Sequence, residues 1–385
     1  MSSASIYLDA NATTTQAPEV TRAIAECCQI FGANPASQHR PGREARRRLE
    51  DAREGIAEIL GARLSGPRPD QLVFTSGGTE ANNLAIFGLS GPRGSRVVIS
   101  SIEHPSVANA ARQLERDNYR VESIGVRTSG VVDPDDLDVL LQKPAHLVSV
   151  MLANHETGAI QPLTRIATHA HQHHALVHTD AVQAIGKIGV DFQSLEVDTM
   201  AVAAHKFHGP LGIGALLLRH GVKLQPLLFG GAQQFGLRPG TENVALSVGM
   251  FTALSLWRDQ ARKRHDHMRQ LRDRFEDALL REISDLVVHC RGVVRLPQTS
   301  NLAFLGLDRQ ALFIALDMAG IACSTGSACQ SGSSEPSPTL TAMGCEKGQI
   351  DSSLRFSFSA STTAAEVEES ARRIIHVCKH LREQD

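Results

Sequence analysis

Three groups able to do chemistry follow three apolar segments of this chain: a glycine-rich turn, a carboxylate and an amine. The turn is Ser76-Gly77-Gly78-Thr79, between an apolar segment at 72–74 and a helix-like segment from 81 onward. Glycines let a backbone approach an anion closely, and a helix N-terminus offers free N–H groups. A plain capping turn has the same composition, so the turn alone leaves phosphate binding and helix capping open.

The amine belongs to Lys206, which follows the apolar segment 197–204 and precedes a glycine-rich stretch at 209–214. Ligands of open α/β sheets bind at the carboxyl ends of the strands, so a lysine there is placed for chemistry. Burial would lower the pKa of its amine and free it for Schiff-base formation. The alternative is an ordinary lysine on a solvated face.

The carboxylate is that of Asp180, which follows the apolar segment 175–178. An acid at this strand end could keep the ring nitrogen of a cofactor protonated, or it could cap a helix. Gln183 lies one helical turn later, and Asn154 follows a segment that ends at 151. Both amides could bind polar substituents of a ring, or could be ordinary turn residues.

The elements that must position these groups are strands separated by helical crossovers. Apolar segments near 72–74, 96–100, 145–151, 175–178, 197–202 and 214–218 alternate with helix-like segments. This alternation predicts an α/β fold with a mostly parallel sheet covered on both faces. A long amphipathic helix over 251–281 then leads to shorter strands and a closing helix at 364–382. We expect a large domain at 15–255 and a smaller α+β domain formed by 1–14 plus 256–385.

Composition excludes several other classes of protein. The 385 residues have a formal net charge of −2, which gives no reason to expect nucleic acid or a membrane surface as partner. We find no secretory signal and no apolar run of about 18 residues. Seven cysteines without regular spacing do not form a disulfide framework, and they favour a reducing cytoplasm. No Walker lysine or Rossmann glycine motif is present, which disfavours a nucleotide-binding domain.

A phosphate turn, an acid and a lysine in this order match a pyridoxal-phosphate site. The sequence resembles the cysteine desulfurases, class V members of the aspartate aminotransferase-like fold, also called fold type I. The resemblance covers nearly the whole chain. The matching stretches are 7–14, 34–37, 75–80, 180–183, 205–206, 238–243, 324–329 and 354–357.

The resemblance implies that the chain binds pyridoxal 5'-phosphate. Lys206 is similar to the Schiff-base lysine, Asp180 to the partner of the pyridine nitrogen and Gln183 to the partner of the ring hydroxyl. His104 resembles the imidazole that stacks on the ring; without the resemblance it is a polar loop residue. The implied phosphate contacts are Gly78, Thr79 and His205, together with Thr241 of a neighbouring subunit, so that a homodimer is implied.

The substrate implied by the resemblance is L-cysteine. Arg355 is similar to the residue that binds its carboxylate, a task for which a guanidinium is well suited. Asn34 and Asn154 are implied as assisting residues. Without the resemblance, Arg355 would be a strand residue paired with a surface acid.

Cys329 lies in a polar stretch of small residues, 324–336, with no apolar anchor for about seven residues after it. Such a segment is expected to be mobile. An exposed thiol there could reach a substrate and then an acceptor. The resemblance makes Cys329 the residue that takes sulfur as a persulfide, in the group of enzymes that supplies iron–sulfur assembly and nitrogenase maturation.

The implied activity converts L-cysteine to L-alanine and passes sulfur to an acceptor protein, such as an iron–sulfur scaffold or a thiolation protein. A selenocysteine lyase or a cysteine or cystine lyase on the same fold is an alternative. A sulfur-relay protein without turnover is another. One departure favours it: Ala203 stands three residues before Lys206, where the family usually has a serine that contacts the phosphate.

Three further features have plain structural explanations. Cys323 could be a second reactive thiol, but we expect a small buried residue. His169 and His173 are one helical turn apart, but no acidic residue or cysteine lies nearby in sequence, so we expect a solvated helix face rather than a metal site. The run 43–53 alternates arginines with acids and predicts a salt-bridged surface helix, with a basic docking patch as the alternative.

Overall fold

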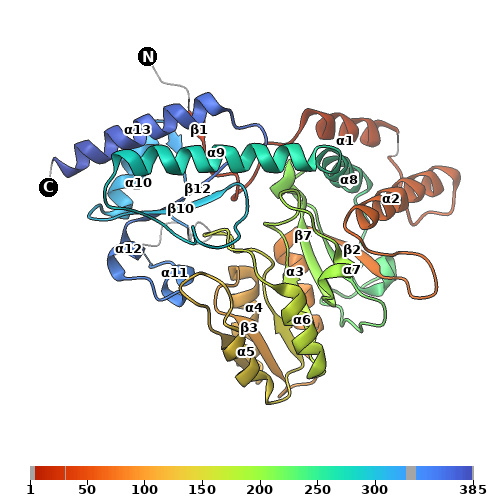
Figure 1. The fold of residues 1–385 in the computed structure, drawn as a ribbon. Coiled ribbons are helices and arrows are strands. Elements are labelled where there is room, and N and C mark those ends of the chain that lie inside the picture. Colours follow the sequence, from red (N-terminus) through yellow and green to blue (C-terminus); the bar gives the residue numbers. More distant parts are fainter. Residues whose placement is uncertain (1–4, 31, 327–334, 384–385) are drawn as a thin grey trace.

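The computed structural model describes residues 5–30, 32–326 and 335–383. A seven-stranded sheet occupies the large part of the molecule, with strand order β2-β8-β7-β6-β5-β3-β4 (Figure 1). From β4 to β7 neighbouring strands are parallel, whereas β8 runs antiparallel to both β7 and β2. The strands are β2 (Gln71–Thr75), β3 (Arg96–Ser100), β4 (Arg120–Ile124), β5 (Leu147–Ser149), β6 (Leu176–Asp180), β7 (Thr199–Ala203) and β8 (Gly214–Leu218).

Helices cover both faces of this sheet because its strands are apolar on both faces. In β2, Val73 joins one core with α3 and α4, while Leu72 and Phe74 join a second core with α2 and α8. Successive side chains of a strand point to opposite faces, so one apolar segment serves two layers. The helices of this part are α1 (Pro18–Ile30), α2 (Arg40–Ile59), α3 (Gly78–Gly88), α4 (Pro105–Arg116), α5 (Pro134–Leu141), α6 (Leu163–Gln172), α7 (Phe192–Leu195) and α8 (Val244–Arg258).

The smaller part of the molecule has a core of its own, which is built on two short sheets. One is antiparallel, with order β12-β10-β9, and the other pairs β1 with β11 in parallel. Phe275, Phe304, Phe356 and Phe358 pack together at its centre. Its elements are β1 (Ile6–Tyr7), α9 (Ala261–Glu282), β9 (Leu286–Val288), β10 (Thr299–Phe304), α10 (Arg309–Met318), β11 (Ile321–Ala322), α11 (Pro338–Ala342), α12 (Lys347–Asp351), β12 (Ser353–Ser357) and α13 (Ala364–Arg382).

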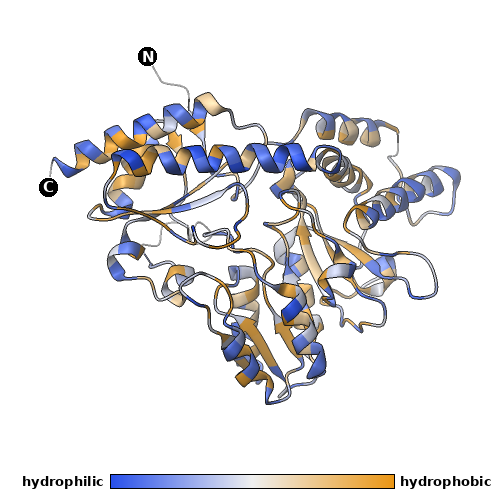
Figure 2. Cartoon of the chain, viewed as in Figure 1, coloured by the Kyte–Doolittle hydropathy of each residue, from blue (hydrophilic) through white to orange (hydrophobic). Residues whose placement is uncertain are grey.

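The single long helix predicted over 251–281 is wrong, because the chain forms two helices there, α8 and α9, with a break at residues 259–260. The two helices have different surroundings. The buried residues of α8 belong to the large core, whereas α9 carries charges along most of its length (Figure 2). The predicted domain boundary after 255 falls inside α8, and the division into domains stays a prediction.

The surface helix predicted from the arginine run is α2, but one of its arginines is buried. Arg53 is 3% exposed; it forms ion pairs with Glu50 and Glu242, each at 3.0 Å, and donates to the carbonyl of Leu72. Charge pattern alone could not show this, because Glu242 lies far away in the sequence. Arg53 therefore holds α2 against the sheet and does not face solvent.

The rings of His169 and His173 stack on each other, with their centroids 5.3 Å apart. Asp138, which the sequence did not place near them, lies 3.3 Å from His169 Nε2. Across the described ranges, no group of three or more histidine, cysteine, aspartate or glutamate side chains is arranged to hold a metal ion. In the same ranges no helix combines the length and apolar character needed to cross a bilayer.

Candidate active site

The strand ends bring the predicted amine and carboxylate to one edge of the sheet. Asp180 ends β6, and Lys206 lies in a single 3₁₀ turn (Ala204–Phe207) directly after β7, the parallel neighbour of β6. Lys206 Nζ donates to the carbonyls of Asn11 and Ala12 at 2.5 and 2.9 Å. Gln183 Nε2 donates to the same Asn11 carbonyl at 3.0 Å. The N-terminal segment thus ties the lysine and the glutamine together.

A cavity of about 370 Å³ opens at this edge. Both parts of the molecule contribute to its wall. Its lining includes Gln183, Lys206, His104 and His155 from the large part and Gly326 and Arg355 from the small part.

The carboxylate of Asp180 is buried and held by two donors. Asn82 Nδ2 donates to Oδ2 at 2.7 Å, and the backbone N–H of Val182 donates to Oδ1 at 2.9 Å. Asn82 Nδ2 also donates to Ser106 Oγ at 2.8 Å, while Asn82 Oδ1 lies 3.1 Å from His178 Nε2. Burial lowers the pKa of His178 to about 3, so this ring is neutral. The network fixes which way the Asn82 amide faces, and with it the Asp180 carboxylate.

The same network reaches His104, the N-cap of α4. His104 Nδ1 accepts from the backbone N–H of Ser106 at 3.1 Å and lies 2.7 Å from Ser106 Oγ. Because a backbone N–H can only donate, Nδ1 is an acceptor and the neutral ring carries its proton on Nε2. Burial lowers the pKa of His104, and nearby Lys206 and Arg355 lower it further against the opposing effect of Asp180.

A second imidazole, which the sequence did not single out, lies beside the first. The rings of His155 and His104 are 5.3 Å apart and nearly perpendicular. Burial holds the pKa of His155 well below its ordinary value, and the neighbouring His104, Arg355 and Lys206 act in the same direction. Its position directly after Asn154, which was singled out, is the one signal that could have drawn attention to it.

The glycine-rich turn forms an uncapped helix N-terminus. No side chain caps the first N–H groups of α3, whose N-cap is Gly77. A Cβ on Gly78 would lie 2.8 Å from Val182 Cγ2 and 3.4 Å from the Ala203 methyl, so a side chain would be crowded there. Thr79 follows on the first turn. Free N–H donors and a closely approaching backbone suit an anion, and phosphate binding here stays a prediction.

His205 is another predicted phosphate contact, and its Nδ1 lies 3.1 Å from Thr13 Oγ1. Burial, together with the smaller effect of nearby Lys206, lowers the pKa of His205 to about 4. A neutral imidazole at this position can offer an anion a hydrogen bond but no charge.

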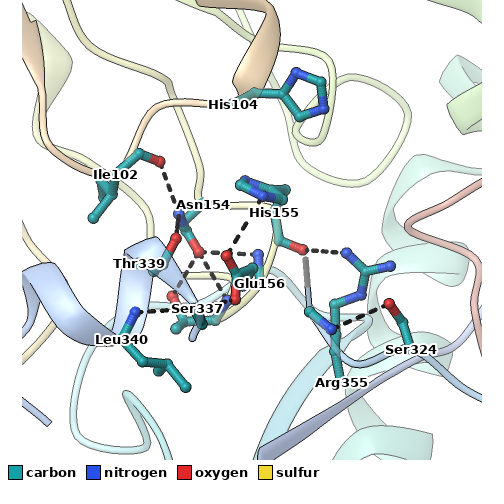
Figure 3. Close-up of polar contacts among 12 residues, drawn as sticks. Ile102, His104, Asn154, His155, Glu156, Ser324, Ser337, Thr339, Leu340 and Arg355 are labelled. Carbon is teal, nitrogen blue, oxygen red and sulfur yellow. Dashed lines mark hydrogen bonds and ion pairs between the residues drawn. The ribbon is translucent and has the colours of Figure 1, made fainter. Parts of the chain in front are cut away.

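Arg355 is buried and held in a fixed direction at the cavity wall. Its Nη2 forms an ion pair with Asp9 Oδ1 at 2.7 Å. Its Nη1 donates to the carbonyl of His155 at 3.0 Å (Figure 3). Its Nε is buried and has no hydrogen-bond partner among the described residues. The guanidinium is therefore oriented by the protein.

Asn154 uses its amide within the protein. Its Oδ1 accepts from the backbone N–H groups of Glu156 and Thr157, each at 2.9 Å, and its Nδ2 donates to the carbonyl of Ile102 at 3.2 Å (Figure 3). Asn154 is fully buried and does not line the cavity. Its amide shapes the turn that carries His155 and Glu156.

Two other predicted residues, Asn34 and Thr241, lie away from the cavity lining. Asn34 is exposed and accepts from the backbone N–H of Ala36 at 2.9 Å, away from the cavity lining. Thr241 is exposed on the loop before α8. Cys329 lies outside the described residues. Cys323 is buried as expected, and burial raises the pKa of its thiol to about 12.

Two carboxyl groups at the cavity were missed by the sequence analysis. Glu103 is buried and accepts from Ser100 Oγ and from the backbone N–H of Met151, each at 2.7 Å. Burial raises its pKa to about 8. Glu156 is also fully buried, and burial raises its pKa. Both residues adjoin a histidine in sequence, but only the fold shows that they are buried.

Comparison with known proteins agrees with this geometry. The family model for aminotransferase class V matches residues 6–369, and the chain belongs to this family. A curated relative named cysteine desulfurase, from Trichormus azollae, is 39% identical over 381 residues, which cover 98% of this chain and 93% of the relative.

Solved structures give the same result. The NifS-like protein from Rickettsia africae superposes with a TM-score of 0.88 at 31% identity, covering 98% of this chain and 99% of the other. A structure described as SspA in complex with cysteine has a TM-score of 0.79 at 29% identity, covering 93% and 100%. The predicted family and the α/β fold with a mostly parallel sheet are therefore confirmed.

Proposed function

We propose that this chain is a pyridoxal-phosphate-dependent cysteine desulfurase that converts L-cysteine to L-alanine and takes the sulfur on Cys329. One observation supports it most: Lys206 and Asp180 lie at adjacent parallel strand ends, beside an uncapped helix N-terminus and an oriented arginine. The relatives named cysteine desulfurase supply the substrate and the reaction for the proposal.

The residues present fit the cofactor. Gln183 Oε1 is a buried acceptor with no partner in the part of the chain that the structure describes, as expected of a group that awaits a ring hydroxyl. Asp180 would hold the ring nitrogen, Lys206 the aldehyde carbon, and the α3 N-terminus with Gly78, Thr79 and His205 the phosphate. When bound, the cofactor would draw electrons away from the substrate Cα.

Ala203 puts one predicted phosphate contact in doubt. Its methyl lies in the cradle, close to Gly78, where the family usually has a hydroxyl. A missing hydrogen bond to a charged group costs about 1.5–3 kcal/mol. The covalent link to Lys206 and the donors of α3 would still hold the cofactor, so we expect weaker cofactor affinity rather than loss of binding.

Substrate binding and proton movement fall to the cavity side chains. Arg355 would bind the α-carboxylate, oriented by Asp9 as described. The Lys206 amine, in its neutral form, would remove the Cα proton. The proton on His104 Nε2 would exchange with the substrate sulfur, because Nδ1 is already used by Ser106.

Sulfur transfer would involve Cys329. Its thiolate attacks the substrate sulfur, so that an S–S bond forms, the substrate C–S bond breaks and the carbon takes up a proton to give alanine. No external oxidant is required. Cys329 is three residues from Gly326, which lines the cavity, and three residues of chain span at most about 11 Å. The persulfide would pass to an acceptor protein, such as an iron–sulfur scaffold or a thiolation protein.

A homodimer is part of the proposal. Exposed apolar side chains gather on the loops that precede α8, among them Phe229, which is 88% exposed, Leu228 and Phe235. A surface of this kind favours burial against a partner. Thr241 lies on the same loop region and would reach the phosphate of the neighbouring subunit.

The test is a spectrum followed by product analysis. The purified protein with pyridoxal 5'-phosphate should absorb in the visible, and added L-cysteine should yield equal amounts of alanine and enzyme persulfide. Pyruvate and ammonia as products would indicate a lyase instead, and turnover of selenocysteine but not cysteine would indicate a selenocysteine lyase. A stable spectrum without any product would indicate a sulfur-relay protein.

A further inference from the structure

Glu156 is a buried carboxyl group that touches both ends of one stretch of chain. Its Oε2 accepts from Ser337 Oγ at 2.6 Å (Figure 3). A Cβ on Gly326 would lie 2.7 Å from the same oxygen. Residues 326 and 337 are eleven positions apart, and Cys329 lies between them. One oxygen atom is thus in contact with the chain before and after this cysteine.

Each end is also fixed by a second set of contacts. Ser324, just before Gly326, exchanges backbone hydrogen bonds with Arg355 at 2.7 and 3.0 Å. At the other end, Ser337 is the N-cap of α11, and its Oγ accepts from the backbone N–H of Leu340 at 3.1 Å. The Ser337 hydroxyl therefore donates to Glu156 while it caps the helix.

Gly326 admits no side chain at this point. Its φ of +89° lies in the region that favours glycine, and the carboxyl oxygen occupies the place of a Cβ. The Glu156 contact therefore fixes the chain closely at Gly326, which lines the cavity.

The other carboxyl oxygen of Glu156, Oε1, lies near a histidine of the cavity wall. Glu156 Oε1 lies 3.7 Å from His155 Nε2, and His155 is the ring that packs against His104. Asn154 strengthens the arrangement, since its Oδ1 accepts from the Glu156 backbone and its Nδ2 lies 3.4 Å from Thr339 Oγ1 on α11. The group that holds both chain ends is thus part of the wall of the reaction cavity.

We propose that Glu156 is a positioning residue for sulfur transfer: it fixes Gly326 and Ser337 against the cavity wall, and so sets where Cys329 begins its reach. The proposal rests on the proposed function of Cys329. Among the described residues, the Glu156 carboxyl group has no hydrogen bond to Lys206, Asp180 or Gln183; its contact with the predicted ligand Asn154 is through the backbone. Loss of the carboxyl group should therefore slow the thiol step and leave earlier steps intact.

The experiment compares Ser337→Ala and Glu156→Ala with two controls. Ser337→Thr keeps a hydroxyl, and Thr341→Ala removes a hydroxyl of the same helix that donates to the Ser337 carbonyl at 2.8 Å rather than to Glu156. Two quantities are followed: the spectral change when L-cysteine binds, and persulfide formed on Cys329 by peptide mass spectrometry. A third readout, alkylation of Cys329 by iodoacetamide in protein without cofactor, reports on the segment independently of activity.

We expect Ser337→Ala and Glu156→Ala to slow persulfide formation by about 10- to 100-fold, because small displacements of a reacting group have effects of this size. The spectral change should keep its cysteine dependence, and the alkylation rate should change. Ser337→Thr and Thr341→Ala should resemble the wild type.

Equal persulfide rates in all variants would overturn the proposal, as would a parallel loss of cysteine binding and persulfide formation. Failure of the proposed function is seen separately, because the wild type would then form no persulfide on Cys329.

Discussion

The two walls of the cavity are built differently. On the wall formed by the large part (the large-domain wall), His104 is backed by a hydrogen-bonded network that includes Ser106, Asn82 and Asp180 and is anchored on strand ends and on α3 and α4. On the wall formed by the small part (the small-domain wall), Arg355 is held by an ion pair with Asp9, and nearby Ser337 donates to Glu156 of the large part.

This difference matches the work proposed for each wall. Cofactor chemistry needs fixed groups, since electrostatic stabilisation depends on preorganised positions. Sulfur transfer needs a thiol that meets the substrate first and an acceptor later. The contacts of Glu156 with Ser337 and Gly326 lie on either side of Cys329 in the sequence, as the proposed sulfur transfer requires.

The largest effect is expected from Lys206→Ala on the large-domain wall. The variant loses both the covalent anchor and the proposed base, and loss of a general base alone costs about 10²- to 10⁴-fold in rate. The visible band should disappear and kcat should fall at least that far. A variant that keeps the visible band and still converts cysteine would show that Lys206 is neither the covalent anchor nor the base.

Arg355→Lys tests the small-domain wall. A lysine keeps the charge but loses the planar fork, so we expect KM for cysteine to rise by about 10- to 150-fold, the value of a charged hydrogen bond. The visible band should be unaffected. If the visible band is lost while KM for cysteine is unchanged, Arg355 contributes to cofactor binding and not to substrate binding.

Ala203→Ser should increase the affinity of the large part for the cofactor. Restoring a hydroxyl in the cradle should tighten cofactor binding by up to about 1.5–3 kcal/mol. The measurement is the dissociation constant of pyridoxal 5'-phosphate after removal and titration, compared with the wild type, which lacks the hydroxyl. Equal affinities for serine and alanine would place the phosphate elsewhere.

The smallest effect concerns stability. Burial raises the pKa of Glu103 to about 8, so the folded state holds this proton where the unfolded state has lost it. Stability from the neutral acid is complete below the ordinary pKa and is lost as pH rises through about 8. Glu103→Gln should therefore lose less Tm than the wild type between about pH 5 and pH 8. Parallel Tm curves would contradict the shift.

Sequence predicted the parts of the fold that depend on local pattern. Val197–Ala204 reads as an apolar strand followed by a lysine, and the strand and the turn lie where expected. The break between α8 and α9 was missed, because both helices have helical periodicity and only burial distinguishes them.

The position of a site residue could be predicted where the residue directly follows an apolar strand in the sequence, as Asp180 does. It could not be predicted where function depends on contacts between distant segments. Asn154 was predicted as a ligand contact or an ordinary turn residue; its amide holds the turn at 156–157, and the ligand role stays a prediction. Glu156 and His155 acquire their roles from Gly326, Ser337 and His104, which approach them only in the folded chain.

The most direct test follows the sulfur atom through one turnover. Protein with bound pyridoxal 5'-phosphate is mixed with less than one equivalent of L-cysteine, quenched with an alkylating agent and digested. We predict that the peptide containing Cys329 gains one sulfur atom for each alanine released, and that Cys329→Ser binds cysteine with its spectral change but releases no alanine. Alanine at the normal rate from Cys329→Ser, or added sulfur on another cysteine, would contradict the account.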